Sequence, residues 1–218
     1  MNDSLVYRIA RAPDPWTPPD WASAPFSNRY DDPEGKYRVL YACSQRLGCF
    51  VETLARFRKG PAELAATLAA IDFARDDDDV PPAILGEVPL DWFGNRMMGT
   101  AELTGSFVDI CSAEWISRIR LQMTPLLKSF GLTEFDASTI QSGQRKITQI
   151  ISRFVYESGA DGILYPSKHG HEFKNWALFE RDNPREPFKI AIQNAEFIRP
   201  NDPDFLECLS LLNLKIGS

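Results

Sequence analysis

The hydrophobic positions along this chain alternate between the two-residue period of strands and the longer period of helices. Short runs that are rich in apolar, β-branched and aromatic residues, and that are bounded by turn residues, predict strands. The predicted strands are Leu5–Ile9, Tyr37–Ala42, Ala83–Val88, Met97–Leu103, Gly162–Pro166, Trp176–Phe179 and Ile190–Ile192.

Four segments carry apolar residues at helical spacing. The strongest is Ser138–Ser158, in which Ile140, Ile147, Ile150, Ile151, Phe154 and Val155 lie on one side, and Gly159 is placed to cap the end. The other predicted helices are Gly48–Lys59 and a helix that opens at Pro61 with Leu64, Leu68 and Ile71 as its buried stripe. Residues 112–130 are predicted to form one or two helices that end at Gly131. Strands and helices are interspersed, so a mixed domain is expected.

Residues 11–26 follow neither period. They contain Pro13, Pro15, Pro18, Pro19 and Pro25 together with two tryptophans. Proline removes a backbone donor and fixes φ, so we expect an irregular arm whose tryptophans hold it to the domain surface. The segment Arg29–Gly35 has the composition of a turn, and the acidic run Asp76–Asp79 that of a solvated loop. With no internal repeat or low-complexity linker, residues 1–218 are predicted to form one domain.

Composition and charge exclude several classes of function. The chain of 218 residues has a formal net charge of −6 and no basic stripe, which argues against a nucleic-acid partner. No stretch approaches the roughly 18 apolar residues that span a membrane, and the start lacks a signal-peptide pattern. The four cysteines form no CxxC pair, so no metal site is expected. We therefore expect a cytoplasmic protein with reduced thiols.

The familiar nucleotide and hydrolase motifs are absent, and residue types alone leave the site open. The chain has no GxGxxG turn, P-loop, GxSxG or HExxH. Glu52 points away from the apolar stripe of its predicted helix and falls in the first turn, which suits a surface glutamate. In the same way Arg29 could pair with Asp31 or Asp32, Tyr41 could be a core aromatic, and Ser167 an ordinary turn residue. His169 and His171 fit an exposed polar turn better than a catalytic triad.

Two longer runs change this interpretation. The run NRYDDPEGKYRVLYACSQRLGCFVETL at 28–54 resembles the opening motif of RES-domain proteins, and ADGILYPSKHGHEFKNWALFE at 160–180 resembles the family's second motif. Together they cover about a quarter of the chain, in the family's order. The helix motif GCFVETL is less rich in alanine than is usual for the family, although its glutamate is present. On this resemblance Arg29, Glu52 and Ser167 match the residues for which the domain is named, and Tyr41 matches the family's site tyrosine.

The resemblance implies an α+β fold similar to the ADP-ribosyltransferase toxins, with a central split β-sheet and surrounding helices. It also implies an enzyme that consumes NAD+ as its substrate and needs no metal. ADP-ribose would pass to water, to phosphate or to a protein acceptor. Several members are toxins with an Xre-like antitoxin, so an antitoxin partner is expected, and a mono-ADP-ribosyltransferase with one protein target is the alternative within this class.

The residue roles follow from the same resemblance. Glu52 would be the catalytic carboxylate that stabilises the electron-poor ribose, and Arg29 would bind NAD+ phosphate oxygens and assist catalysis. Tyr41 and Ser167 would position NAD+, Tyr30 would help to line the pocket, and Asn175 would order the second loop. A non-catalytic nucleotide- or protein-binding domain, and a Ser167-dependent hydrolase, are the competing hypotheses from other classes.

Overall fold

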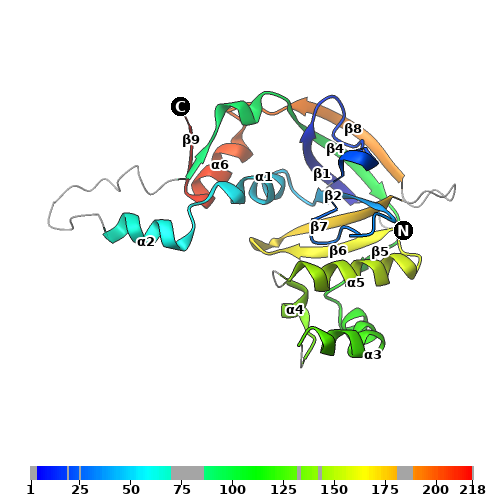
Figure 1. The fold of residues 1–218 in the computed structure, drawn as a ribbon. Coiled ribbons are helices and arrows are strands. Elements are labelled where there is room, and N and C mark those ends of the chain that lie inside the picture. The colour runs from blue at the N-terminus through cyan, green and yellow to red at the C-terminus, as the bar shows by residue number, and fades with distance from the viewer. Residues whose placement is uncertain are drawn as a thin grey trace.

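The computed structural model describes residues 4–18, 20–24, 26–69, 86–131, 134–141, 144–180 and 189–217. A seven-stranded mixed sheet runs through the molecule (Figure 1). Its spatial order is β5 (Phe107–Asp109), β6 (Gly162–Ser167), β7 (Gly170–Glu180), β2 (Arg38–Cys43), β1 (Ser4–Arg11), β4 (Arg96–Thr104) and β8 (Lys189–Phe197). Only the β5–β6 pair is parallel within this sheet.

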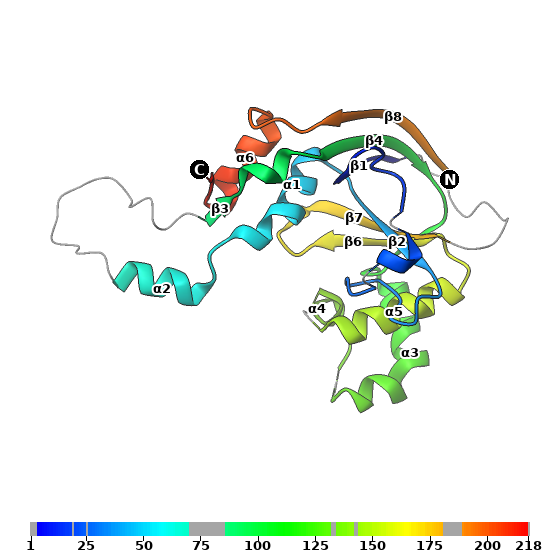
Figure 2. The ribbon, with the colours of Figure 1, turned by 45° about the horizontal axis from the view of Figure 1, so that its top comes forward.

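The sheet is split between β1 and β2. Strand β1 pairs with β4 along its whole length from Ser4 to Arg11, and β2 pairs with β7 from Arg38 to Cys43. Between β1 and β2, by contrast, the register of the described strands holds the pair Tyr7–Cys43 alone. The half formed by β1, β4 and β8 therefore curves away from the half formed by β2, β7 and β6 (Figure 2). The split-sheet α+β architecture expected above is thus present.

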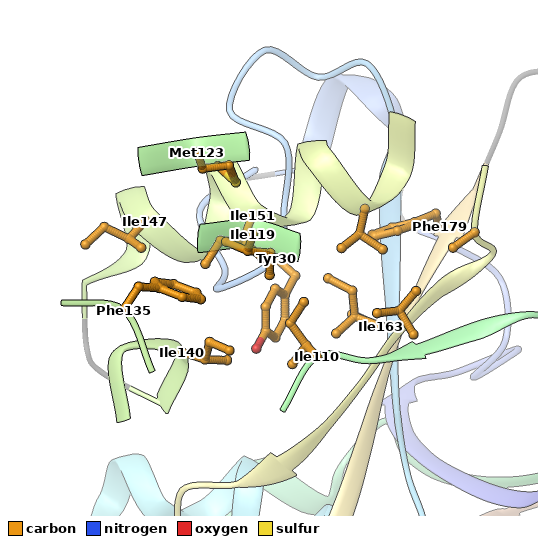
Figure 3. Close-up of a cluster of buried hydrophobic side chains, with 14 of the residues drawn as sticks. Tyr30, Ile110, Ile119, Met123, Phe135, Ile140, Ile147, Ile151, Ile163 and Phe179 are labelled. Atoms are coloured by element: carbon orange, nitrogen blue, oxygen red, sulfur yellow. The ribbon is translucent and has the colours of Figure 1, made fainter. Parts of the chain in front are cut away.

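Three helices pack together beside the half-sheet that contains β6 and β7. They are α3 (Ala113–Ser129), α4 (Ala137–Gln141) and α5 (Arg145–Glu157). Helix α5 buries Ile147, Ile151 and Val155 in the same apolar cluster as Ile163 of β6 and Phe179 of β7 (Figure 3). Because these side chains recur at the helical period, the apolar stripe seen in the sequence is the surface that fixes α5 to the sheet.

A second layer lies at the opposite end of the molecule, where α1 (Arg46–Leu54) contacts α6 (Pro203–Leu212). Phe50 and Phe205 meet edge to face with ring centroids 5.8 Å apart. Arg46 adds ion pairs to Asp202 at 2.6 Å and Asp204 at 2.9 Å. A short parallel pair, β3 (Gly86–Val88) and β9 (Leu214–Ile216), adjoins this layer. Helix α2 spans Pro61–Ala69.

The proline-rich arm is held mainly by one tryptophan. Trp16 is buried in an apolar cluster with Val6 of β1 and Leu40 of β2. A Cβ atom at Gly99 would lie 2.6 Å from Trp16 Nε1, so the arm's close approach to β4 requires a glycine there. Trp21 is 41% exposed, although the Arg38 guanidinium lies over its ring at 4.8 Å. The expected docking of the arm is therefore confirmed for Trp16, whereas Trp21 remains at the surface.

Several elements differ from the sequence prediction. The single helix expected over Ser138–Ser158 is two helices, because Gln144 has non-helical angles (φ −78°, ψ 86°) and α5 begins after it. The helix expected over Gly48–Lys59 begins earlier and ends at Leu54, where a 3-10 turn, η2 (Ala55–Phe57), follows. Strands β5 and β9 and helix α6 were not predicted. The Leu68 and Ile71 side chains, Asp76–Asp79 and residues 83–85 lie outside the described part of the chain.

The glycine ends of the helices were predicted correctly. Gly131 follows α3 with φ +75°, and Gly159 follows α5 with φ +89°. Positive φ is strained for residues that carry a Cβ atom, so glycine at these points ends a helix without a steric penalty. Both helix ends could be predicted from the sequence, because the need for a residue that tolerates positive φ depends only on the local backbone.

Candidate active site

The split in the sheet forms one wall of a pocket of about 430 Å³. Arg8 and Ile9 of β1 line one side of it, and Tyr41 to Cys43 of β2 line the other. Helix α1 adds Cys49, Glu52 and Thr53, and β7 adds Asn175. The pocket exists because β1 and β2 diverge on either side of the Tyr7–Cys43 pair.

Three of the predicted site residues line this pocket together: Arg29, Tyr41 and Glu52. Two others do not. Tyr30 is fully buried, and its ring packs against Tyr165, a pocket residue, with centroids 4.7 Å apart. Ser167 is also buried, and its Oγ accepts a hydrogen bond of 3.0 Å from the backbone N–H of His169. Tyr30 therefore packs against a pocket residue, whereas Ser167 bonds the backbone beside Lys168, another pocket residue.

Glu52 is exposed, as the sequence interpretation expected, but its position within the helix differs from that interpretation. Helix α1 begins at Arg46, so Glu52 lies in its last turn, and the first turn has no acidic residue. A carboxylate near the C-terminal end of a helix gains nothing from the macrodipole, which is negative there. The carboxylate is instead fixed by Asn175, whose Nδ2 donates a hydrogen bond of 2.7 Å to Oε1.

Tyr41 is fixed in the pocket wall by two hydrogen bonds. Its hydroxyl donates to Asp31 Oδ1 at 2.9 Å and accepts from the backbone N–H of Tyr30 at 3.1 Å. Burial raises the pKa of Tyr41 well above its ordinary value, with the Asp31 charge acting in the same direction, so the phenol stays protonated. Asp31 also accepts from the backbone N–H of Asn28 at 2.8 Å. These contacts connect the Arg29–Gly35 turn to β2 and place Arg29 at the pocket.

The pocket is positively charged although the chain as a whole is acidic. Of its described lining residues four are cationic, namely Arg8, Arg29, Arg145 and Lys168, and Glu52 is the one carboxylate. Arg8 is held by backbone carbonyls, donating to Tyr41 O and to Pro15 O at 2.7 Å each. Burial lowers the pKa of Arg8 to about 10, which still leaves it charged at neutral pH. Such a surface favours an anionic ligand.

Sequence reasoning missed most of these cations. Arg8 lies in a strand before the first motif, where the alternating pattern indicated only a strand. Arg145 lies in α5 after the helix break, and its Nη1 donates to Ser27 O at 3.1 Å. Lys168 was inside the second motif but carried no signal of its own. The four cations come from four separate segments of the chain, so only the tertiary structure shows the charge of the pocket.

Two cysteines form part of the wall beside Glu52. Cys43 and Cys49 are free thiols, and both are buried. The Cys49 thiol donates a hydrogen bond to Cys43, which lowers the pKa of Cys43. Burial raises the pKa of Cys49, and its role as a donor to Cys43 acts in the same direction. The wall next to the Glu52 carboxylate thus contains two thiols whose pKa values are shifted in opposite directions.

Among the described residues there is no group of three or more His, Cys, Asp or Glu side chains that could hold a metal ion. In the same part of the chain, no helix has both the length and the apolar character needed to cross a membrane.

Comparison with solved structures supports the fold. A chain of the M. tuberculosis MbcT–MbcA toxin–antitoxin complex superposes with a TM-score of 0.56, covering 96% of this chain and 88% of that chain. The sequence identity is 14%, so the likeness concerns the fold alone. None of the curated proteins compared matches the sequence. The model of the RES domain matches residues 5–199, nearly the whole chain, and this protein therefore belongs to the RES-domain family.

Proposed function

We propose that this chain is an enzyme that breaks the nicotinamide–ribose bond of NAD+. The observation that carries the proposal is the carboxylate of Glu52, held by Asn175 at 2.7 Å, in a pocket whose other charged side chains, among the described residues, are four cations. Membership of the RES-domain family supports the same conclusion. The pocket of about 430 Å³ is within the range of small-molecule and cofactor sites.

The charges of the pocket suit the charges of this substrate. The pyrophosphate of NAD+ is anionic, and planar guanidinium groups such as that of Arg29 bind phosphate oxygens through paired N–H donors. Breaking the bond to nicotinamide leaves an electron-poor, oxocarbenium-like ribose. A fixed carboxylate beside that carbon stabilises the developing positive charge, and this is the role that we propose for Glu52.

The aromatic residues would position the ligand. Tyr41 and Tyr165 line the pocket, and each presents a flat ring against which a base or ribose could pack. Tyr30 and Ser167, which were expected to touch NAD+, are buried and are not among the described lining residues of the pocket. We therefore propose that they shape the pocket, Tyr30 through its contact with Tyr165 and Ser167 through the turn at His169.

The acceptor of ADP-ribose is water, phosphate or a protein side chain. We further propose that the protein is the toxin of a toxin–antitoxin pair and that an Xre-like antitoxin binds it. The support is the RES-domain family match and the fold shared with a chain of a toxin–antitoxin complex. A mono-ADP-ribosyltransferase with a single target is the alternative within this chemistry, and a non-catalytic nucleotide- or protein-binding domain is the alternative outside it.

One experiment separates these alternatives. The purified protein is incubated with NAD+, with and without phosphate and cell extract, and the products are identified by mass. Free ADP-ribose indicates water as the acceptor, its phosphate ester indicates phosphate, and turnover that requires extract indicates a protein target. Absence of nicotinamide release under all three conditions would overturn the enzymatic proposal and favour the binding domain.

The matched variants are Glu52→Gln and Glu207→Gln. Glu52→Gln keeps the shape of the side chain and removes the charge, so nicotinamide release should be lost while the fold persists. Glu207 is an exposed glutamate on α6, and its replacement should leave the rate unchanged. Equal rates for the two variants would exclude Glu52 from the chemistry. Arrest of growth on expression of the wild type, but not of Glu52→Gln, tests the toxin role.

A further inference from the structure

A second hollow, of about 660 Å³, lies at the end of β1 and shares no residue with the pocket described above. Three arginines line it: Arg11, the last residue of β1; Arg96, the first residue of β4; and Arg56 of η2. Among the lining residues that the structure describes, Asp91 is the one carboxylate. The hollow therefore gathers positive charge in a chain with a net charge of −6.

The three arginines are placed where their charges repel. Arg11 and Arg96 occupy directly opposed positions in the antiparallel β1–β4 register. Like charges at such positions destabilise a sheet. Burial lowers the pKa of Arg96, and the charges of Arg56 and Arg11 lower it further.

Within the described residues, the charge of Asp91 offsets this repulsion only in part, by raising the pKa of Arg96. None of the three arginines forms an ion pair with a carboxylate there. Arg46 shows the contrast, because its guanidinium contacts carboxylates of both β8 and α6. An anion in the hollow would supply the missing compensation.

Two of the guanidinium groups lie over the faces of aromatic rings. Arg96 lies over Trp92 at 5.0 Å and Arg56 lies over Phe57 at 4.7 Å, each measured from the guanidinium carbon to the ring centroid. A planar cation placed over a ring keeps N–H groups at its edge available for a ligand. One such group on Arg96 donates weakly to Trp92 O at 3.4 Å. The hollow is therefore lined by guanidinium groups stacked on aromatic rings, and two N–H groups of one guanidinium can bind two oxygen atoms of an oxyanion.

We propose that this hollow is an anion-binding site that takes a phosphoryl group. With three arginines and one aspartate, the described part of the lining keeps two positive charges, which matches the roughly −1.5 to −2 charge of a phosphate monoester at neutral pH. A single carboxylate would neutralise only half of that charge. The site is independent of the proposed NAD+ chemistry, because it shares no residue with the pocket that contains Glu52.

The test measures phosphate binding to the Arg29→Gln variant. This substitution weakens anion binding in the other cationic pocket, which contains Glu52. Inorganic phosphate is titrated at constant ionic strength, with chloride as the balancing anion, and the melting temperature is recorded. We expect a saturable rise in Tm. Adding Arg11→Gln or Arg96→Gln should raise the Kd by about tenfold or more, since each removes a charge-assisted donor.

The control is Arg118→Gln in the same background. Arg118 also lies over a tryptophan, Trp115 at 4.5 Å, but it belongs to α3, which contributes no residue to the described lining of the hollow, so its replacement should not affect the Kd. A rise in Tm that does not saturate, or that persists unchanged in the Arg11 and Arg96 variants, overturns the proposal. An equal affinity for acetate would overturn the assignment to a phosphoryl group.

A second measurement does not depend on ligand binding. If Arg11 and Arg96 repel each other, Arg11→Gln should leave the phosphate-free protein as stable as its parent or more so. A lower Tm for Arg11→Gln without phosphate would show that Arg11 stabilises the fold by other contacts, and it would remove the charge-repulsion basis of the site.

Discussion

Asn175 of β7 holds Glu52 of α1 by a hydrogen bond of 2.7 Å between Nδ2 and Oε1, across 123 residues of sequence. The contact joins the two family-like motifs in space. Asn175 also lies opposite Cys43 in the β2–β7 register, and Cys43 in turn lies opposite Tyr7 at the point where the sheet splits. The orientation of the carboxylate is therefore set by the same strands that open the pocket.

Asn175→Leu should lower kcat for nicotinamide release by about tenfold or more and leave KM nearly unchanged. Leucine keeps the approximate volume but removes the donor, so Glu52 loses its fixed orientation while the cationic wall persists. Steady-state kinetics on NAD+ measures this split. Gln193→Leu, which removes a surface hydrogen bond of 2.7 Å to Glu102, is the control. A change confined to KM would show that Asn175 binds substrate and does not act by positioning Glu52.

The pH dependence of stability should contain a contribution from His169. Burial lowers the pKa of His169 below its ordinary value of 6.5, although the nearby charge of Glu52 acts in the opposite direction. The unfolded chain therefore binds a proton more readily than the folded one as the pH falls through 6.5, and folding stability declines there. Urea unfolding at pH 7.5 and at pH 5.5, which are about one unit either side of the ordinary histidine pKa, should show a smaller difference for His169→Asn than for the wild type.

The pKa of His169 also depends on the charge of Glu52. Removing the Glu52 charge removes the interaction that favours the imidazolium, so the pKa of His169 should fall further in Glu52→Gln. The chain has two histidines, and His171→Asn leaves a single imidazole to follow by NMR titration. An unchanged His169 titration in Glu52→Gln would show that the two groups do not interact in solution.

Cys43 should be alkylated by iodoacetamide before Cys49 and Cys208. The thiolate is the reactive form, and the hydrogen bond from Cys49 lowers the pKa of Cys43. Burial raises the pKa of Cys208 to about 12 and also raises that of Cys49. Peptide mass spectrometry over time gives the order of labelling. NAD+ should slow labelling at Cys43, which lines the pocket, and equal rates with and without NAD+ would count against binding there.

Gly48→Ala should destabilise the protein by about 1–3 kcal/mol, the usual cost of an added methyl group in a packed interior. A Cβ atom there would lie 2.5 Å from Cys43 Sγ and 3.1 Å from the Phe173 ring. Gly94→Ala is the control, since its Cβ would approach no heavy atom closer than the 3.4 Å to Asp91 O. Chemical denaturation compares the two. Equal stabilities would mean that α1 moves away from β2 at no cost.

Local patterns were sufficient for most elements of the fold. The apolar stripe of α5, the alternation of β1 and β4 and the positive-φ glycines Gly131 and Gly159 each reflect a requirement that nearby residues satisfy. Strand β5 was missed because its three residues are too short for a period to show, and α6 was missed although Asp202 caps it through the N–H groups of Asp204 and Phe205. The break before α5 was hidden because the helical spacing continues across it.

The sequence by itself determined the acidic mixed domain, the position of most of its strands and helices, and the two motifs that bring Arg29, Tyr41 and Glu52 forward as candidates. Only the tertiary structure placed these three side chains around one pocket and buried Tyr30 and Ser167 outside its described lining. It also decided the charge of that pocket, through Arg8, Arg145 and Lys168. The physical reason is that burial and electrostatic potential depend on which distant segments meet, whereas periodicity and turn chemistry depend on neighbours in the chain.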